Sequence, residues 1–128
     1  MQAMCQYEVL GDEFSAQLDE FLADESDAAS VRDYARALAT HAWTNRDAID
    51  ARIATASQHW DVKRMSAVDR NILRAAVGEL ESHPDVPPPV VIDEAVEIAK
   101  LYGAADSSAF VNGVLDSIVK SAAPTPGA

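Results

Sequence analysis

Apolar side chains recur every three or four residues through most of this chain, and this spacing constrains the fold more than any other feature. In one stretch the repeat comprises Val68, Ile72, Leu73, Ala76, Val77 and Leu80. Such spacing places the apolar side chains on one face of an α-helix. No stretch alternates with the period of two that a half-buried strand requires. The sequence therefore predicts an all-α fold.

Glycines, prolines and capping residues divide the helical pattern into about seven helices. Gly11 is expected to end a first short helix, and 12–24 to form a second. A long helical region is expected from about Val31 to Trp60, with a bend at Asn45. The remaining helices are predicted from Ser66 to Leu80, from Val91 to Tyr102 and after Asp106, and the loop 81–89 contains four prolines.

The chain of 128 residues has the length of one domain, which we place at residues 1–122. Residues 123–128 contain Pro124, Pro126 and Gly127, and we expect them to form a disordered tail. Cys5 is the single cysteine and cannot form an internal disulfide. No apolar run reaches the roughly 18 residues that a membrane span needs. These features predict a cytoplasmic protein with no membrane association.

The net charge of −11 disfavours nucleic-acid binding by the chain as a whole, because Lys and Arg drive phosphate binding. From Met1 to Val31 there are eight acidic residues and no Lys or Arg. The most basic window contains Lys63, Arg64, Arg70 and Arg74. RNA binding would therefore be local or would depend on a partner.

The sequence offers no basis for catalysis. His41, His59 and His83 are scattered, and none has the spacing that a zinc site requires. No glycine-rich phosphate loop is present. We therefore predict that the protein is not an enzyme and has no catalytic residue, bound metal or cofactor.

Four segments resemble one protein family. Residues 89–100 read PVVIDEAVEIAK, residues 103–116 read GAADSSAFVNGVLD, and residues 68–80 read VDRNILRAAVGEL. Together with a weaker match at 1–7, they resemble the bacterial transcription antitermination factor NusB. Residues 12–60 match that family only in helical character. The resemblance implies two packed three-helix bundles.

The resemblance also implies a function. Proteins of this family bind the ribosomal protein that doubles as NusE. The heterodimer binds boxA, a short single-stranded element of ribosomal RNA transcripts, and joins the RNA polymerase antitermination complex. We expect the free protein to be a monomer or a homodimer.

Candidate site residues follow from the matching positions and, for Lys63, Arg64 and Lys100, from their basic side chains, which suit phosphate contacts. Expected RNA contacts are Gln2, Lys63, Arg64, Lys100, Ser107 and Phe110. Expected contacts to the NusE-type ribosomal protein are Val9, Asp69 and Asp106. Structural roles compete with several of these: Asp106 also has the position of a helix N-cap, and scattered bases often belong to plain surface.

Four further residues have expected structural roles. Arg74 is expected to be partly buried and to pair with a carboxylate, for which Glu94 is the candidate, whereas Arg70 is expected on a solvated face. Asn112 is expected to form a hydrogen bond across a helix interface or to cap a neighbouring helix, and Gly113 to allow close helix packing.

The chain departs from the family pattern at its start. The family's first helix is preceded by an arginine-rich segment, and we expect such a segment upstream of Met1. Two alternatives stay open: an RNA-docking domain like those attached to ribosomal RNA cytosine methyltransferases, and a helical adaptor that binds only protein.

Overall fold

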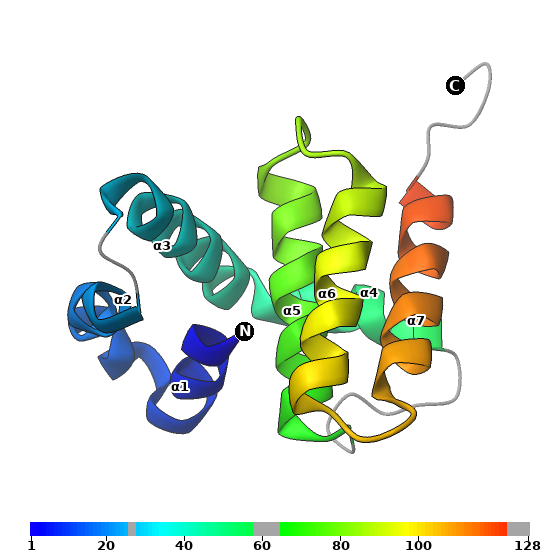
Figure 1. Cartoon of the computed structure of the whole chain (residues 1–128), viewed down its shortest axis with the longest axis horizontal. Coiled ribbons are helices and arrows are strands. Elements are labelled where there is room, and N and C mark those ends of the chain that lie inside the picture. The colour runs from blue at the N-terminus through cyan, green and yellow to red at the C-terminus, as the bar shows by residue number, and fades with distance from the viewer. Residues whose placement is uncertain (26–27, 58–64, 123–128) are drawn as a thin grey trace.

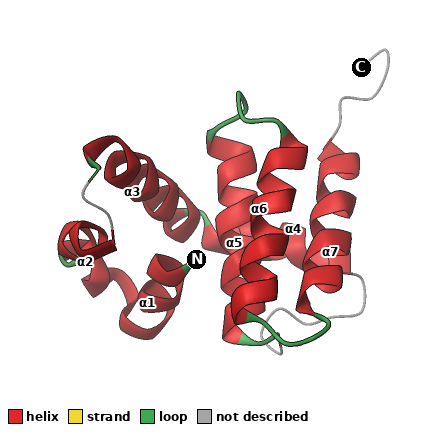
Figure 2. Cartoon of the chain, viewed as in Figure 1, coloured by secondary structure: helices red, strands yellow, loops and turns green. Residues whose placement is uncertain are grey.

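The structure is a computed structural model that describes residues 1–25, 28–57 and 65–122 (Figure 1). The regular elements in these ranges are all helical, which confirms the predicted all-α fold (Figure 2). They are α1 (Gln2–Leu10), the 3₁₀ helix η1 (Gly11–Ala16), α2 (Leu18–Glu25), α3 (Ala29–Thr44), α4 (Arg46–Ser57), α5 (Ala67–Ser82), α6 (Pro88–Tyr102) and α7 (Ser107–Ala122). None of the described helices is both long and apolar enough to cross a membrane.

The N-terminal bundle comprises α1, η1, α2 and α3, which surround a small aromatic core. Tyr7 is central to it: its ring stacks on Trp43 at 5.0 Å and meets the edge of Phe14 at 4.9 Å. Leu18 and Leu22 from the following segment complete this core. Aromatic pairs in these geometries add to the stability gained from burial alone.

The C-terminal bundle comprises α4, α5, α6 and α7, with α5 at its centre (Figure 1). Ile72, Leu73 and Val77 of α5 are buried, as the apolar repeat predicts. Met4 of α1 and Ala42 of α3 also belong to this core. The two bundles therefore share a packed boundary along α5.

Polar contacts join α3 and α4 to the C-terminal half of α5. The Tyr34 hydroxyl donates to Glu79 at 2.5 Å. Burial and the adjacent Glu79 carboxylate raise the pKa of Tyr34 above its ordinary value. Glu81 pairs with Arg52 at 2.7 Å and contacts His41 at 3.1 Å.

Two predicted helix boundaries are confirmed in detail. Gly11 follows α1 with φ of 69°, a conformation that costs glycine little. Ser66 caps α5, because its Oγ accepts from the Asp69 backbone N–H at 3.1 Å. Such a cap is worth about 1 kcal/mol.

Two boundaries differ from those predicted. The segment 12–24 is a 3₁₀ helix followed by α2 rather than one helix. Helix α6 begins at Pro88, three residues before Val91, with prolines in its first turn. A proline is compatible with the first helical position, because the N–H that it lacks would have no intrahelical acceptor there. The bend expected at Asn45 separates α3 from α4.

Candidate functional site

Several predicted site residues lie at one end of the C-terminal bundle. Helix α5 begins, α6 ends and α7 begins at this end (Figure 1). Asp69 lies in the first turn of α5, Lys100 in the last turn of α6, and Asp106 directly before α7. The fold thus gathers residues that are far apart in the sequence.

The turn between α6 and α7 is compact. Ser107 is buried, and its Oγ accepts from the Ala104 backbone N–H at 2.9 Å. A Cβ at Gly103 would lie 2.5 Å from the Ser107 Cβ, so a larger residue at position 103 would force the turn apart. The Ser107 side chain therefore supports the turn from inside.

Asp106 and Phe110 face outward to different degrees. Asp106 is exposed, and its carbonyl accepts from the Phe110 backbone N–H at 3.1 Å, as expected of the residue that precedes a helix. Phe110 is half-buried and packs against the edge of the larger core. Partly exposed aromatic side chains are the kind of group that holds unpaired RNA bases by stacking.

The other predicted contacts are more dispersed. Lys100 is exposed and pairs with Glu97 at 3.3 Å. Gln2 is exposed at the start of α1, and Val9, near the end of the same helix, is 80% exposed. Lys63 and Arg64 lie outside the described residues.

Asp69 has an unpaired carboxylate oxygen. Its Oδ1 is buried, and among the described side chains it is the one such atom without a hydrogen-bond partner. Buried acceptors in proteins are nearly always satisfied, so an exception calls for an explanation. The carboxylate charge of Asp69 is therefore not compensated through this oxygen by the described part of the chain.

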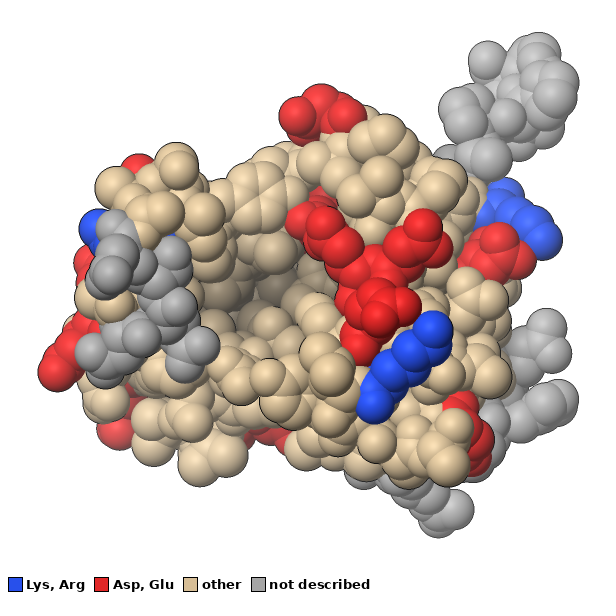
Figure 3. Space-filling view, in the orientation of Figure 1, with Lys and Arg blue, Asp and Glu red and all other residues tan. Residues whose placement is uncertain are grey.

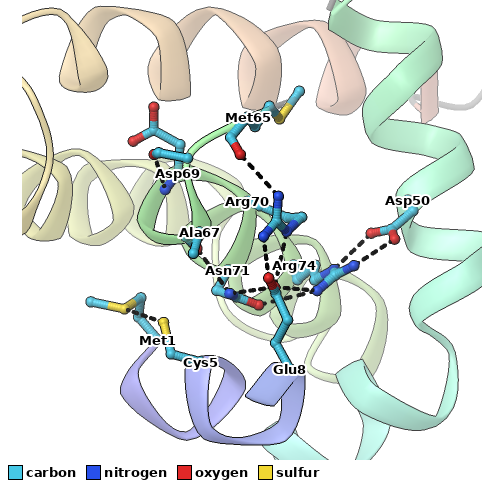
Figure 4. A network of polar contacts seen from close by, with 11 residues as sticks. Met1, Cys5, Glu8, Asp50, Met65, Ala67, Asp69, Arg70, Asn71 and Arg74 are labelled. Atoms are coloured by element: carbon cyan, nitrogen blue, oxygen red, sulfur yellow. Dashed lines mark hydrogen bonds and ion pairs between the residues drawn. The ribbon is translucent and has the colours of Figure 1, made fainter. Parts of the chain in front are cut away.

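A polar network that the sequence reasoning missed lies beside Asp69 (Figure 4). Its centre is the Glu8 carboxylate, which pairs with Arg70 and Arg74 and accepts from Asn71. Arg74 also pairs with Asp50 at 2.7 Å. Two signals could have indicated it: Glu8 follows the buried Met4 by four residues, and Arg70 and Arg74 share one helix face.

The network corrects two predictions. Arg74 is 8% exposed and has carboxylate partners, as expected, but these are Asp50 and Glu8 rather than Glu94, which is exposed on α6. Arg70 is not on a solvated face, because it pairs with Glu8 and donates to the Met65 carbonyl at 2.9 Å. In both cases an acidic residue from an earlier helix compensates the arginine charge.

The expectations for Asn112 and Gly113 were wrong. Both residues are exposed on α7. A Cβ at Gly113 would meet no described atom within 4 Å, so close helix packing does not require this glycine.

Glu8 makes stability depend on pH. Hydrogen bonds from the Arg70 side chain lower the pKa of Glu8 below its ordinary value, and a hydrogen bond from the Asn71 side chain acts in the same direction. These bonds outweigh partial burial, which raises the pKa. A lowered pKa contributes stability above the unfolded-state value of about 4.3, and this contribution is lost as the pH falls through the folded-state pKa. We expect Glu8→Gln to be less stable than wild type at pH 7, and the difference to shrink below about pH 4. Urea denaturation from pH 7 to pH 3 would measure it, and a constant difference would contradict this assignment.

One face of the molecule is acidic and hollowed. Figure 3 shows acidic side chains gathered over α6, where Asp93, Glu94 and Glu97 are exposed. Beside them is a hollow of about 170 Å³, lined mainly by apolar residues of α1, α2, α3 and α5 and by Gln2. This surface suits a basic partner better than a bare phosphate backbone.

Comparison with known proteins identifies the family. A model of the NusB family matches residues 1–120. The chain belongs to the NusB family. A solved structure of NusB from T. maritima superposes with a TM-score of 0.86 and 40% identity, over 96% of this chain and 87% of that one. This similarity confirms the NusB-like fold that the sequence motifs predicted.

Two relatives named transcription antitermination protein NusB illustrate the extent of the match. The protein from Citrifermentans bemidjiense is 47% identical over 104 residues, which cover 78% of this chain and 72% of the relative. The protein from Symbiobacterium thermophilum is 38% identical over 136 aligned positions, which cover 100% of this chain and 89% of the relative.

Proposed function

We propose that this chain is a transcription antitermination factor that binds boxA-type single-stranded RNA of ribosomal RNA transcripts together with the NusE-type ribosomal protein. Membership of the NusB family across residues 1–120 carries this proposal. The clustering of Asp69, Lys100, Asp106 and Phe110 at one end of the C-terminal bundle supports it. The complex would act within the RNA polymerase antitermination assembly.

Charge favours a two-protein mechanism for RNA binding. With a net charge of −11, the chain repels phosphates at long range but attracts a basic ribosomal protein. In the complex the ribosomal protein would supply much of the positive charge. The exposed acidic side chains over α6 fit this division of roles.

The RNA-binding roles follow from the surface around the α6–α7 turn. Phe110 would stack on an unpaired base, and Lys100 would contact a phosphate. Ser107 would hold the turn that presents them, because its hydroxyl is engaged inside the fold. We propose Gln2, Lys63 and Arg64 as additional RNA contacts.

The proposed protein-binding face comprises Val9, Asp69 and Asp106. Reversing the charges of its two acidic residues tests this face. Asp69→Lys combined with Asp106→Lys should weaken binding of the NusE-type protein by about tenfold, or about 1.4 kcal/mol. The reason is that both lysines would repel a basic partner. Isothermal titration calorimetry with the purified ribosomal protein would measure the change.

A matched variant controls for net charge. Glu20→Lys combined with Asp85→Lys makes the same change in charge at exposed positions away from the α6–α7 turn. Its affinity should stay within about twofold of wild type, since long-range effects are screened by salt. Equal affinity of wild type and the Asp69/Asp106 variant, with circular dichroism confirming that it is folded, would show that the face is wrongly placed.

A further inference from the structure

We propose that Glu8 is the positioning residue of the protein-binding face. Its carboxylate fixes the end of α1, which carries Val9, against the first turns of α5, which carry Asp69. The inference rests on the proposed function, because it concerns how those two contacts are held in one geometry. Neither the apolar packing nor the helix caps require a carboxylate at this position.

Glu8 accepts hydrogen bonds from three side chains of a single helix. Arg70 donates to both carboxylate oxygens, with its Nε 2.9 Å from Oε2. Asn71 donates to Oε2 at 2.7 Å, and Arg74 donates to the same oxygen at 2.9 Å. Because the two oxygens are held from three directions, the carboxylate has one position relative to α5 (Figure 4).

Each donor is also anchored to a second group. Arg70 donates to the Met65 carbonyl at 2.9 Å, and Asn71 donates to the Ala67 carbonyl at 2.8 Å. Arg74 donates to both carboxylate oxygens of Asp50 on α4, at 2.8 and 2.7 Å. The network therefore connects α1, α4, the first turns of α5 and Met65, which directly follows Lys63 and Arg64 in the sequence.

The energetics favour a geometric role over simple stabilisation. Two carboxylates and two guanidinium groups are balanced in charge, but their partial desolvation offsets much of their attraction. Apolar residues of similar volume often stabilise a fold as well or better, whereas polar networks are best attested for setting register. Here the register that Glu8 sets is that of Val9 relative to Asp69.

A double-mutant cycle on partner affinity tests this role. The variants are Glu8→Gln, Asp69→Asn and their combination, titrated with the purified NusE-type ribosomal protein at a temperature where circular dichroism shows each to be folded. We expect each single variant to bind about fivefold more weakly than wild type. In the Glu8→Gln background, Asp69→Asn should cost less than about twofold, because Val9 on α1 and Asp69 on α5 are no longer held in one geometry for the partner.

Arg52→Gln is the matched control. It removes an ion pair to Glu81 near the other end of α5, so it perturbs the same helix without touching the network. Its effect should be additive with that of Asp69→Asn. If Glu8→Gln does not fold, Arg70→Lys replaces it, because lysine keeps the charge but cannot reproduce the forked contact with Glu8.

The outcomes separate the two proposals. If Asp69→Asn weakens binding by the same factor with and without Glu8, the positioning role is wrong and the protein-binding face stands. If Asp69→Asn has no effect in the wild-type background, the face itself is wrong, and the role of Glu8 falls with it. The inference is supported if the effect of Asp69→Asn on affinity is smaller in the Glu8→Gln or Arg70→Lys background but unchanged in the Arg52→Gln background.

Discussion

Replacement of Arg74 by methionine is expected to lower the free energy of unfolding by about 3 kcal/mol. Methionine fills a similar volume, so the change isolates the loss of the guanidinium group. Asp50 would lose two donors at 2.8 and 2.7 Å, and Glu8 would lose one. Since Arg74 is 8% exposed, water can replace these donors only in part. Urea denaturation at pH 7 would measure the loss.

Arg36→Met provides the comparison for this prediction. Arg36 pairs with Asp19 at 2.5 Å and with Asp33 at 2.8 Å, but all three side chains are largely exposed. Ion pairs at exposed positions contribute little, so the expected loss is much smaller than that for Arg74→Met. Equal losses of unfolding free energy for the two variants would mean that burial does not make the ion pairs of Arg74 more stabilising than those of Arg36.

The helices were largely predictable because each follows from local information. The apolar repeat of α5 determines which face of the helix is buried. Ser66 marks the start of α5, because its side chain accepts a hydrogen bond from the backbone of Asp69, three residues later in the sequence. Helix α6 shows the limit of such signals. The run of prolines predicts a loop, yet Pro88 lies in the first helical turn of α6, where proline is tolerated.

The candidate site was predictable only where one segment carries it. The residues of the α6–α7 turn are candidates from the sequence because a single motif contains them. The Glu8 network was missed because its ion pairs join residues 62 and 66 positions apart. Periodicity indicates that Arg74 is near the buried face, but it cannot say which carboxylate meets it there. The choice of Glu94 followed the order of helices in the chain, whereas the packing brings α1 and α4 to this arginine.

The largest expected functional effect concerns Phe110. With the NusE-type ribosomal protein present, Phe110→Ala should weaken binding of a boxA-type RNA oligonucleotide by about 1–3 kcal/mol, the usual value of stacking on one base. The salt dependence of binding should not change, because the ring neutralises no phosphate. Fluorescence anisotropy at several salt concentrations would give both quantities.

Phe110→Leu separates stacking from packing. Phe110 also contacts the larger core, so alanine removes buried surface as well as an aromatic face. Leucine keeps most of the apolar contact but cannot stack in the same way. The Phe110→Leu variant should therefore bind RNA nearly as weakly as Phe110→Ala while remaining more stable.

Lys100→Gln should differ from both Phe110 variants by changing the salt dependence of RNA binding, with a salt slope lower by about one unit. If leucine restores wild-type affinity, Phe110 acts only through the fold, and the RNA-binding surface must be sought elsewhere. If RNA binding needs no added ribosomal protein, the proposed dependence on a basic partner is wrong.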